Sequence, residues 1–206
     1  MSLFRPSLAL LAVVSLAALA GCGSTPAVRY YSLSTATAAA ATTTAPTAKP
    51  LLIEVPPLAL PERLVRPQLV VRTAANQVDV LELHRWTAPF DSELRDALAS
   101  SIAARLGAVD VSGGGRLAGQ PVYRVAVQLR QWEAVDNSRV EASFSWTIRR
   151  SDEARNIACQ WSQSVPVGAG IAALAQGAQQ LTAQAAQRMA ASLSALDADA
   201  AAQCPA

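Results

Sequence analysis

The stretch from Val140 to Arg150 limits the possible folds more than any other part of the chain. Apolar and polar residues alternate along it, with Val140, Ala142, Phe144, Trp146 and Ile148 on one side and Glu141, Ser143, Ser145, Thr147 and Arg149 on the other. Successive side chains of a strand point to opposite faces, so this pattern predicts a strand with one buried face and one wet face. Such strands are typical of an antiparallel sheet that is covered on one side.

Two more strands are expected beside it. The stretch from Val122 to Glu133 connects to it through a turn at Asp136-Asn137-Ser138, and a third strand runs from about Arg155 to Val165. One face of that third strand carries Ile157, Cys159 and Trp161. Because short turns join antiparallel neighbours, the three strands predict a meander.

Two long helices are expected outside the meander. The first runs from about Ala88 to Leu106, with Thr87 as its N-cap and Gly107 as its stop. The second runs from about Gly170 to Leu196. Both carry a stripe of apolar residues at helical spacing: Leu94, Leu98, Ile102 and Leu106 in the first, and Ile171, Leu174, Ala178, Leu181, Ala185, Met189, Leu193 and Leu196 in the second.

Shorter strands are expected earlier in the chain, at residues 28–33, 51–55, 69–72 and 78–83, the last of them in a packed layer. Prolines make residues 58–68 irregular. The order of strands, helix, three-strand meander and helix predicts an α+β fold. Its sheet should be antiparallel-dominated, with the two long helices packed on one face.

The N-terminus has the layout of a secretory signal peptide, with Arg5 ahead of an apolar run at residues 8–18 that is too short to span a membrane. The order Leu19-Ala20-Gly21-Cys22 resembles the lipobox of bacterial lipoproteins. That resemblance implies cleavage after residue 21 and lipidation of Cys22. Two or three acyl chains would hold the protein permanently on a membrane. In the enterobacterial sorting rule an Asp after the Cys retains a lipoprotein at the inner membrane, so Gly23 favours the outer membrane.

Residues 22–28 should form the lipidated N-terminus and a short tether, followed by a single domain at residues 29–197 and a loose tail at residues 198–206. Residues 35–50 consist almost entirely of Ala, Thr and Pro and should form a flexible loop. If Tyr30 and Tyr31 pair into the sheet, this loop lies inside the domain; otherwise the tether is longer. We favour pairing, because two tyrosines are costly to leave in water.

Charge and cysteine content bear on partners. Cleavage leaves 185 of the 206 residues, and the loss of Arg5 leaves 16 basic against 15 acidic residues, which gives no electrostatic reason to expect a nucleic acid. Cys159 and Cys204 remain after lipidation of Cys22. They either form a disulfide in an oxidising periplasm or stay apart, as a buried inert thiol and a free thiol in the tail.

Motifs for familiar catalysis are absent from the sequence. His84 is the only histidine, so no zinc site is expected, and it has no nucleophile motif nearby. Gly113-Gly114-Gly115 lacks the Lys-Ser/Thr pair of a phosphate-binding loop. We expect no catalytic residue, no metal and no cofactor.

The second helix has an unusual polar face, formed by Gln176, Gln180, Gln184 and Gln187. No charged residue occurs between Arg155 and Arg188. The face is either the wet side of a soluble alanine-rich helix or a surface packed against a neighbouring subunit.

With this order of elements, the chain resembles the ABC-type transport auxiliary lipoproteins, the family of the PqiC-like membrane-integrity subunits. The resemblance lies in Tyr30-Tyr31-Ser32-Leu33 after Cys22, in the stretch Leu64-Val65-Arg66-Pro67-Gln68-Leu69-Val70-Val71-Arg72, and in Arg85-Trp86-Thr87-Ala88-Pro89-Phe90. It covers nearly the whole mature chain.

This resemblance implies a non-enzymatic role at the periplasmic face of the outer membrane. The lipoprotein would form a homo-oligomeric ring and dock an MCE-domain protein of PqiB-like type, supporting lipid transport and envelope integrity. Arg66, Gln68, Arg85 and Trp86 are candidates for the partner interface, although Trp86 could instead fill the gap between strand and helix. Alternatives are a lipopolysaccharide-export plug, a peptidoglycan-binding module, or a hydrolase dependent on His84.

Overall fold

A computed structural model describes residues 26–34, 50–115 and 119–205. The predicted signal peptide, Cys22 and the Ala/Thr-rich residues 35–49 lie outside the described residues. Of the loop expected at residues 35–50, only Pro50 is described.

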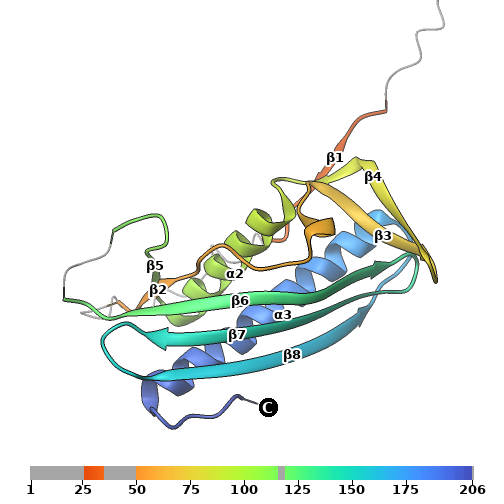
Figure 1. The fold of residues 1–206 in the computed structure, drawn as a ribbon. Coiled ribbons are helices and arrows are strands. Elements are labelled where there is room, and N and C mark those ends of the chain that lie inside the picture. The colour runs from red at the N-terminus through yellow and green to blue at the C-terminus, as the bar shows by residue number, and fades with distance from the viewer. Residues whose placement is uncertain (1–25, 35–49, 116–118, 206) are drawn as a thin grey trace, which may run out of the picture.

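The domain has two layers, a curved sheet of eight strands and a pair of long helices that lie side by side on one of its faces (Figure 1). The strands are β1 (Arg29–Tyr31), β2 (Leu52–Glu54), β3 (Gln68–Ala74), β4 (Gln77–Trp86), β5 (Val109–Asp110), β6 (Val122–Val135), β7 (Arg139–Arg150) and β8 (Asn156–Pro166). The helices are α2 (Phe90–Leu106) and α3 (Ile171–Ala198), and a short 3₁₀ turn, η2, spans Glu62–Leu64. This is the predicted α+β class.

The sheet is mixed, so the prediction of an antiparallel-dominated sheet was wrong. β3 pairs with β4, β6 with β7, and β7 with β8 in antiparallel fashion, but β1–β4, β2–β5, β2–β6 and β3–β6 are parallel pairs. The antiparallel pairs are those that short turns connect. The short strands β1, β2 and β5 meet partners from distant parts of the chain, and an alternation pattern reports which face is buried but not strand direction.

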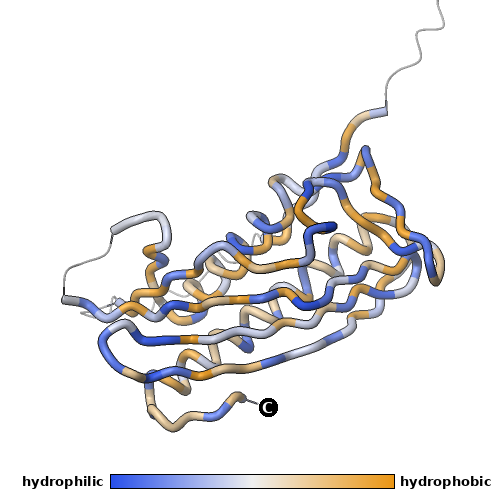
Figure 2. Tube along the Cα trace, viewed as in Figure 1, coloured by the Kyte–Doolittle hydropathy of each residue, from blue (hydrophilic) through white to orange (hydrophobic). Residues whose placement is uncertain are grey.

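The meander, α2 and α3 form the main core. The five apolar residues of β7 that alternate from Val140 to Ile148 are at most 4% exposed. They face the stripe of α3, whose residues from Leu174 to Leu196 are buried as predicted. Figure 2 shows the hydrophobic and hydrophilic residues following one another along these strands. The packing is closest at Gly177, where an added Cβ would lie 2.4 Å from a methyl group of Val167.

The C-terminal end of helix α2 was predicted correctly, but its N-cap was not. It ends as expected at Gly107, which has a left-handed backbone with φ of 59°. Its N-cap is Pro89 and not Thr87, so that prediction was wrong. The Thr87 hydroxyl instead donates to the carboxylate of Glu93, a buried acceptor that needs donors.

Two strands are more exposed than the sequence indicated. Val78 and Val80 of β4 are 49% and 37% exposed, because they pair with Arg72 and Val70 and so lie on the hairpin face opposite to the buried Leu69 and Val71. Tyr30 pairs into the sheet as predicted, yet it is 62% exposed while Tyr31 packs against the core. The prediction that the tyrosines pair into the sheet is confirmed. The reason given for it, burial of both rings, holds only for Tyr31.

Candidate partner interface

Two of the predicted interface segments meet in the structure. The backbone N–H of Trp86 donates to the carbonyl of Pro67 over 2.7 Å, and Gln68 lies opposite Arg85 in the β3–β4 register. The four residues Arg66, Gln68, Arg85 and Trp86 therefore form one cluster where the hairpin approaches the start of α2.

The polar members of this cluster are organised by Glu82. Gln68 Nε2 donates to Glu82 Oε2 at 3.1 Å, and Arg85 Nε donates to the Glu82 carbonyl at 2.9 Å. The Arg85 and Glu82 side chains also form a surface ion pair at 3.6 Å. Such an exposed pair contributes little to stability, so these groups are available to rearrange around a bound partner.

Trp86 lies under the surface. It is 5% exposed and packs against Phe90, with ring centroids 5.6 Å apart, and Phe90 packs against Trp132 at 4.9 Å. The structure thus places Trp86 between strand and helix, which was the structural alternative for this residue. Its polar neighbours Arg66, Gln68 and Arg85 are half-buried.

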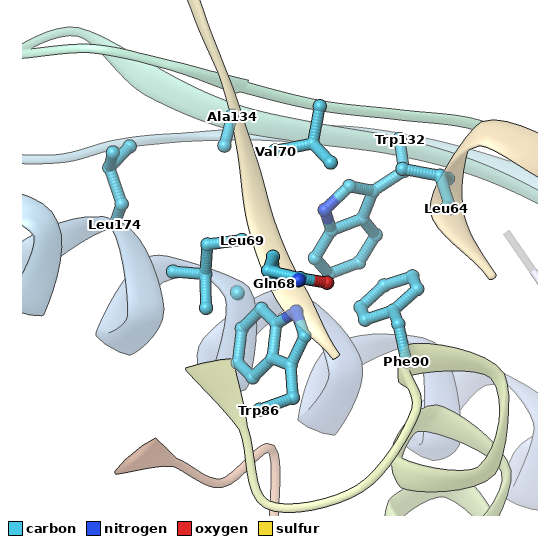
Figure 3. Close-up of a pocket in the computed structure, with 10 residues that line it drawn as sticks. Leu64, Gln68, Leu69, Val70, Trp86, Phe90, Trp132, Ala134 and Leu174 are labelled. Carbon is cyan, nitrogen blue, oxygen red and sulfur yellow. The ribbon is translucent and has the colours of Figure 1, made fainter. Parts of the chain in front are cut away.

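The three aromatic rings also line a small apolar pocket. Figure 3 shows Trp86 from the end of β4, Phe90 from the start of α2 and Trp132 from β6 facing a shared space. Its other walls come from β3, η2, β6 and α3: Leu64, Gln68, Leu69, Val70, Ala134, Leu174 and Ala178. The enclosed part measures about 20 Å³, which is room for little more than one small group.

Glu93 has a structural role that the sequence did not reveal. The residue is 7% exposed, and its carboxylate accepts hydrogen bonds from the Ser32 hydroxyl at 2.8 Å, from the Leu33 backbone N–H at 2.8 Å and from the Thr87 hydroxyl. The sequence showed only an acidic residue in the first turn of a helix, which the helix dipole explains equally well. The contacts fasten the N-terminal segment to α2.

The glutamine face of α3 is a separate surface. Gln176, Gln180 and Gln187 are exposed and Gln184 is half-buried. Leu174 and Ala178, which line the aromatic pocket, point to the opposite side of the same helix. The neighbouring Gln179 donates to the carbonyl of Ser34 at 2.7 Å, so this helix also holds the N-terminal segment.

Cys159 and Cys204 form a disulfide that joins β8 to the C-terminal tail. Arg155 also donates to the carbonyls of Leu196 and Asp197 at 3.1 and 3.0 Å. The segment that was expected to be loose is therefore attached to the sheet at Cys204. Cys159 of β8 is buried against Ser192 of α3.

His84, the remaining sequence candidate, adjoins the cluster on β4. His84 Nδ1 is 2.9 Å from the Tyr31 hydroxyl, and the two rings stack, so His84 fastens β1 to β4.

No group of three or more metal-ligating side chains occurs among the described residues. Within the same residues, no helix combines the length and the apolarity that crossing a membrane requires.

The fold and these sites define a small two-layer α+β domain without a recognisable catalytic centre among the described residues. Residues 31–190 match the family of the ABC-type transport auxiliary lipoprotein component, and the chain belongs to this family. The match includes the three segments that carry the sequence resemblance, except for Tyr30 at its edge.

Solved structures share the fold at low sequence identity. An uncharacterized protein is 19% identical with a TM-score of 0.62, and the alignment covers 82% of this chain and 99% of that one. A Xanthomonas campestris protein of the DUF330 family is 16% identical with a TM-score of 0.53, covering 78% of this chain and 88% of that one. No curated protein sequence is significantly similar to the chain.

Proposed function

We propose that this protein is an outer-membrane lipoprotein that docks an MCE-type intermembrane lipid transport assembly through protein–protein contacts, without catalysis. The family membership supports a transport auxiliary role. The lipobox ending at Cys22 supplies the membrane anchor, and Gly23 favours the outer membrane.

The observation that carries the proposal is the fastening of the N-terminal segment to the domain. β1 pairs with β4, and Ser32 and Leu33 are bound by Glu93. Six residues lie between Cys22 and Arg29, and the seven Cα–Cα steps of a fully extended chain reach at most about 25 Å. The end of the domain that carries β1 would therefore stay near the bilayer, with the Arg66–Arg85 cluster close by.

The glutamine face of α3 is the surface we assign to neighbouring copies in a homo-oligomeric ring. Amide side chains donate and accept, so glutamines can pair with identical or unlike surfaces. The cluster formed by Arg66, Gln68, Arg85 and Trp86 is then left for the MCE-domain partner. Two surfaces on different sides of one domain are what a docking subunit in an oligomer needs.

Crosslinking in intact envelopes tests this proposal. The wild-type protein should co-purify with an MCE-domain protein after crosslinking and detergent extraction, and Cys22→Ser should abolish both membrane retention and co-purification. Arg85→Glu should weaken capture, while Arg105→Glu, an exposed change on the far end of α2, should not. Recovery of no MCE-domain protein from crosslinked envelopes would overturn the docking role.

A second candidate is binding to peptidoglycan. The uncovered face of the sheet holds an open hollow of about 780 Å³ lined by polar groups such as Gln128, Arg130, Ser145, Thr147 and Gln160. Hydroxyl, amide and guanidinium groups suit a glycan. Co-sedimentation with purified sacculi, lost in Arg130→Ala, would favour this alternative over the first.

A further inference from the structure

The sheet has a gap between β3 and β6. One edge of β6 pairs with β2 at residues 122–124 and bridges to Ala59 at Gln128, and it meets β3 only at the pair Arg72–Val135. From Arg130 to Glu133, no backbone hydrogen bond from another part of the described chain reaches this edge. β3 and β6 diverge from this single backbone bridge, which leaves a wedge between two strand edges, bordered by the segment that leads from Ala59 through η2 to β3.

Backbone groups on both sides point into this wedge. Asp136 donates its N–H to the Arg72 carbonyl at 3.0 Å, so this N–H is directed toward β3. In an antiparallel strand such groups alternate, which directs the N–H groups of Ala134 and Trp132 to the same edge. On β3, the same alternation from Arg72 directs the N–H and C=O of Val70 toward β6.

The floor of the wedge is apolar. Trp86, Phe90 and Trp132 line the pocket that lies beneath it, together with Val70 and Ala134 from the two edges (Figure 3). Side chains of a strand alternate between the two sheet faces. A strand placed in the wedge would therefore direct alternate side chains to these rings.

Two orphan polar atoms belong to residues that neighbour the pocket-lining Gln68 and Phe90 in the chain. Arg66 Nε, a donor, and Asp91 Oδ1, an acceptor, are buried without a hydrogen-bond partner among the described residues. Their backbones adjoin, because Phe90 N–H donates to the Arg66 carbonyl at 3.2 Å. A buried polar group without a partner is costly, and a peptide group offers both an acceptor and a donor.

We propose that the wedge between β3 and β6 receives an extended segment of a partner protein, which adds to the sheet as a strand and points an apolar side chain at Trp86, Phe90 and Trp132. An alkyl chain would fill the floor but would leave the free N–H and C=O groups of both edges unpaired. An added strand would pair with the free backbone groups and would also place an apolar side chain on the floor of the wedge. The inference rests on the proposed docking role and specifies the chemistry of what docks.

A synthetic peptide tests it without the natural partner. The probe is an acetylated and amidated pentapeptide with leucine at its centre and two threonines on each side. It is titrated into the isotope-labelled chain from residue 22 onward carrying Cys22→Ser. The backbone amide signals of Val70, Trp132 and Ala134 and the indole signals of Trp86 and Trp132 should shift together.

Two controls separate strand addition from simple burial. A peptide with the same side chains but N-methylated at alternate amides should bind at least tenfold more weakly, because it cannot pair with a strand edge. Ala134→Leu, which fills the wedge, should weaken binding by a similar factor. Ala126→Leu, an exposed position on the same strand outside the wedge, should bind the peptide like the wild type.

Three results would overturn the inference: equal binding of the N-methylated peptide, shifts confined to another edge such as β8, or decanoate producing the same shifts while the peptide produces none. The last would assign the pocket to alkyl chains. If the peptide does not bind but an MCE-domain protein is still captured in envelopes, the inference fails and the docking role stands. If no MCE-domain protein is captured but the peptide binds, the docking role fails and the wedge still accepts a strand.

Discussion

The carboxylate of Glu93 accepts a hydrogen bond from the backbone N–H of Leu33 at 2.8 Å, although the two residues are 60 positions apart in sequence. The same carboxylate binds the hydroxyls of Ser32 and Thr87. One side chain at the start of α2 therefore collects three donors and holds the segment that leads to the predicted membrane anchor. This contact connects the fold to the proposed function.

We expect Glu93→Ala to lower the free energy of unfolding by about 2–4 kcal/mol, because it leaves buried donors without an acceptor. Urea denaturation followed by circular dichroism measures the change. Glu62→Ala, an exposed change in η2, is the matched control and should stay within about 0.5 kcal/mol of wild type. Equal effects of the two substitutions would show that Glu93 does not hold the segment.

Gly177→Ala should destabilise the domain by about 1–2 kcal/mol even though alanine favours helices more than glycine does. The added methyl would lie 2.4 Å from Val167 and 3.3 Å from Val140. The double variant Gly177→Ala with Val167→Ala should recover part of the loss, since the smaller side chain removes the closer clash. A double-mutant cycle of thermal denaturation gives the coupling. If the destabilisations of the two single variants simply add in the double variant, the added methyl does not clash with Val167.

Cys204→Ser should lower the free energy of unfolding by up to about 4 kcal/mol, the loop-closure value for a 45-residue loop. The wild type should show the same loss when a reductant is added. The variant should be insensitive to reductant, which serves as the internal control. If reduction leaves the wild-type melting temperature unchanged, the disulfide does not contribute to stability.

The stability of the domain should fall at alkaline pH because of Tyr123. Burial, together with its hydrogen bond to Asp197 and the negative charge of Asp197, raises the pKa of Tyr123 from 10.0 to about 12, while Arg150 and Arg155 act in the opposite direction. The unfolded chain loses this proton first. The contribution is therefore complete below pH 10 and is lost as the pH rises towards 12.

Urea unfolding between pH 8 and 11.5 measures this dependence. Tyr123→Phe should be less stable at pH 8 and should show a flatter decline above pH 10. Lys49 is the only lysine in the chain, so few other groups titrate in this range. An equally steep decline in the Phe variant would assign the pH dependence to other groups.

The parts of the fold that the sequence predicted are those with long periodic patterns. The alternation in β7 and the stripe of α3 each involve many residues that face one core, so both elements and their buried faces follow from periodicity. β2 and β5 have three and two residues, too few for a pattern, and their parallel partners come from distant segments. The mixed sheet therefore could not be read from local sequence.

The candidate interface stays a prediction, but the structure shows how its residues are arranged. Arg66, Gln68, Arg85 and Trp86 were identified separately, and the structure places them together because Pro67 and Trp86 share a backbone hydrogen bond. The roles of Phe90, Trp132 and Glu93 depend on tertiary contacts. Nothing in the spacing of these three residues distinguishes them from ordinary core or helix-start residues.

The covalent bond between Cys159 and Cys204 encloses all 28 residues of α3 in one loop. If heat or detergent pulls this helix off the sheet, both its ends stay within a short distance of β8. The displaced helix then has few alternative positions and little freedom to exchange with that of a neighbouring copy. A protein confined to a crowded membrane surface would in this way recover its own fold after envelope stress.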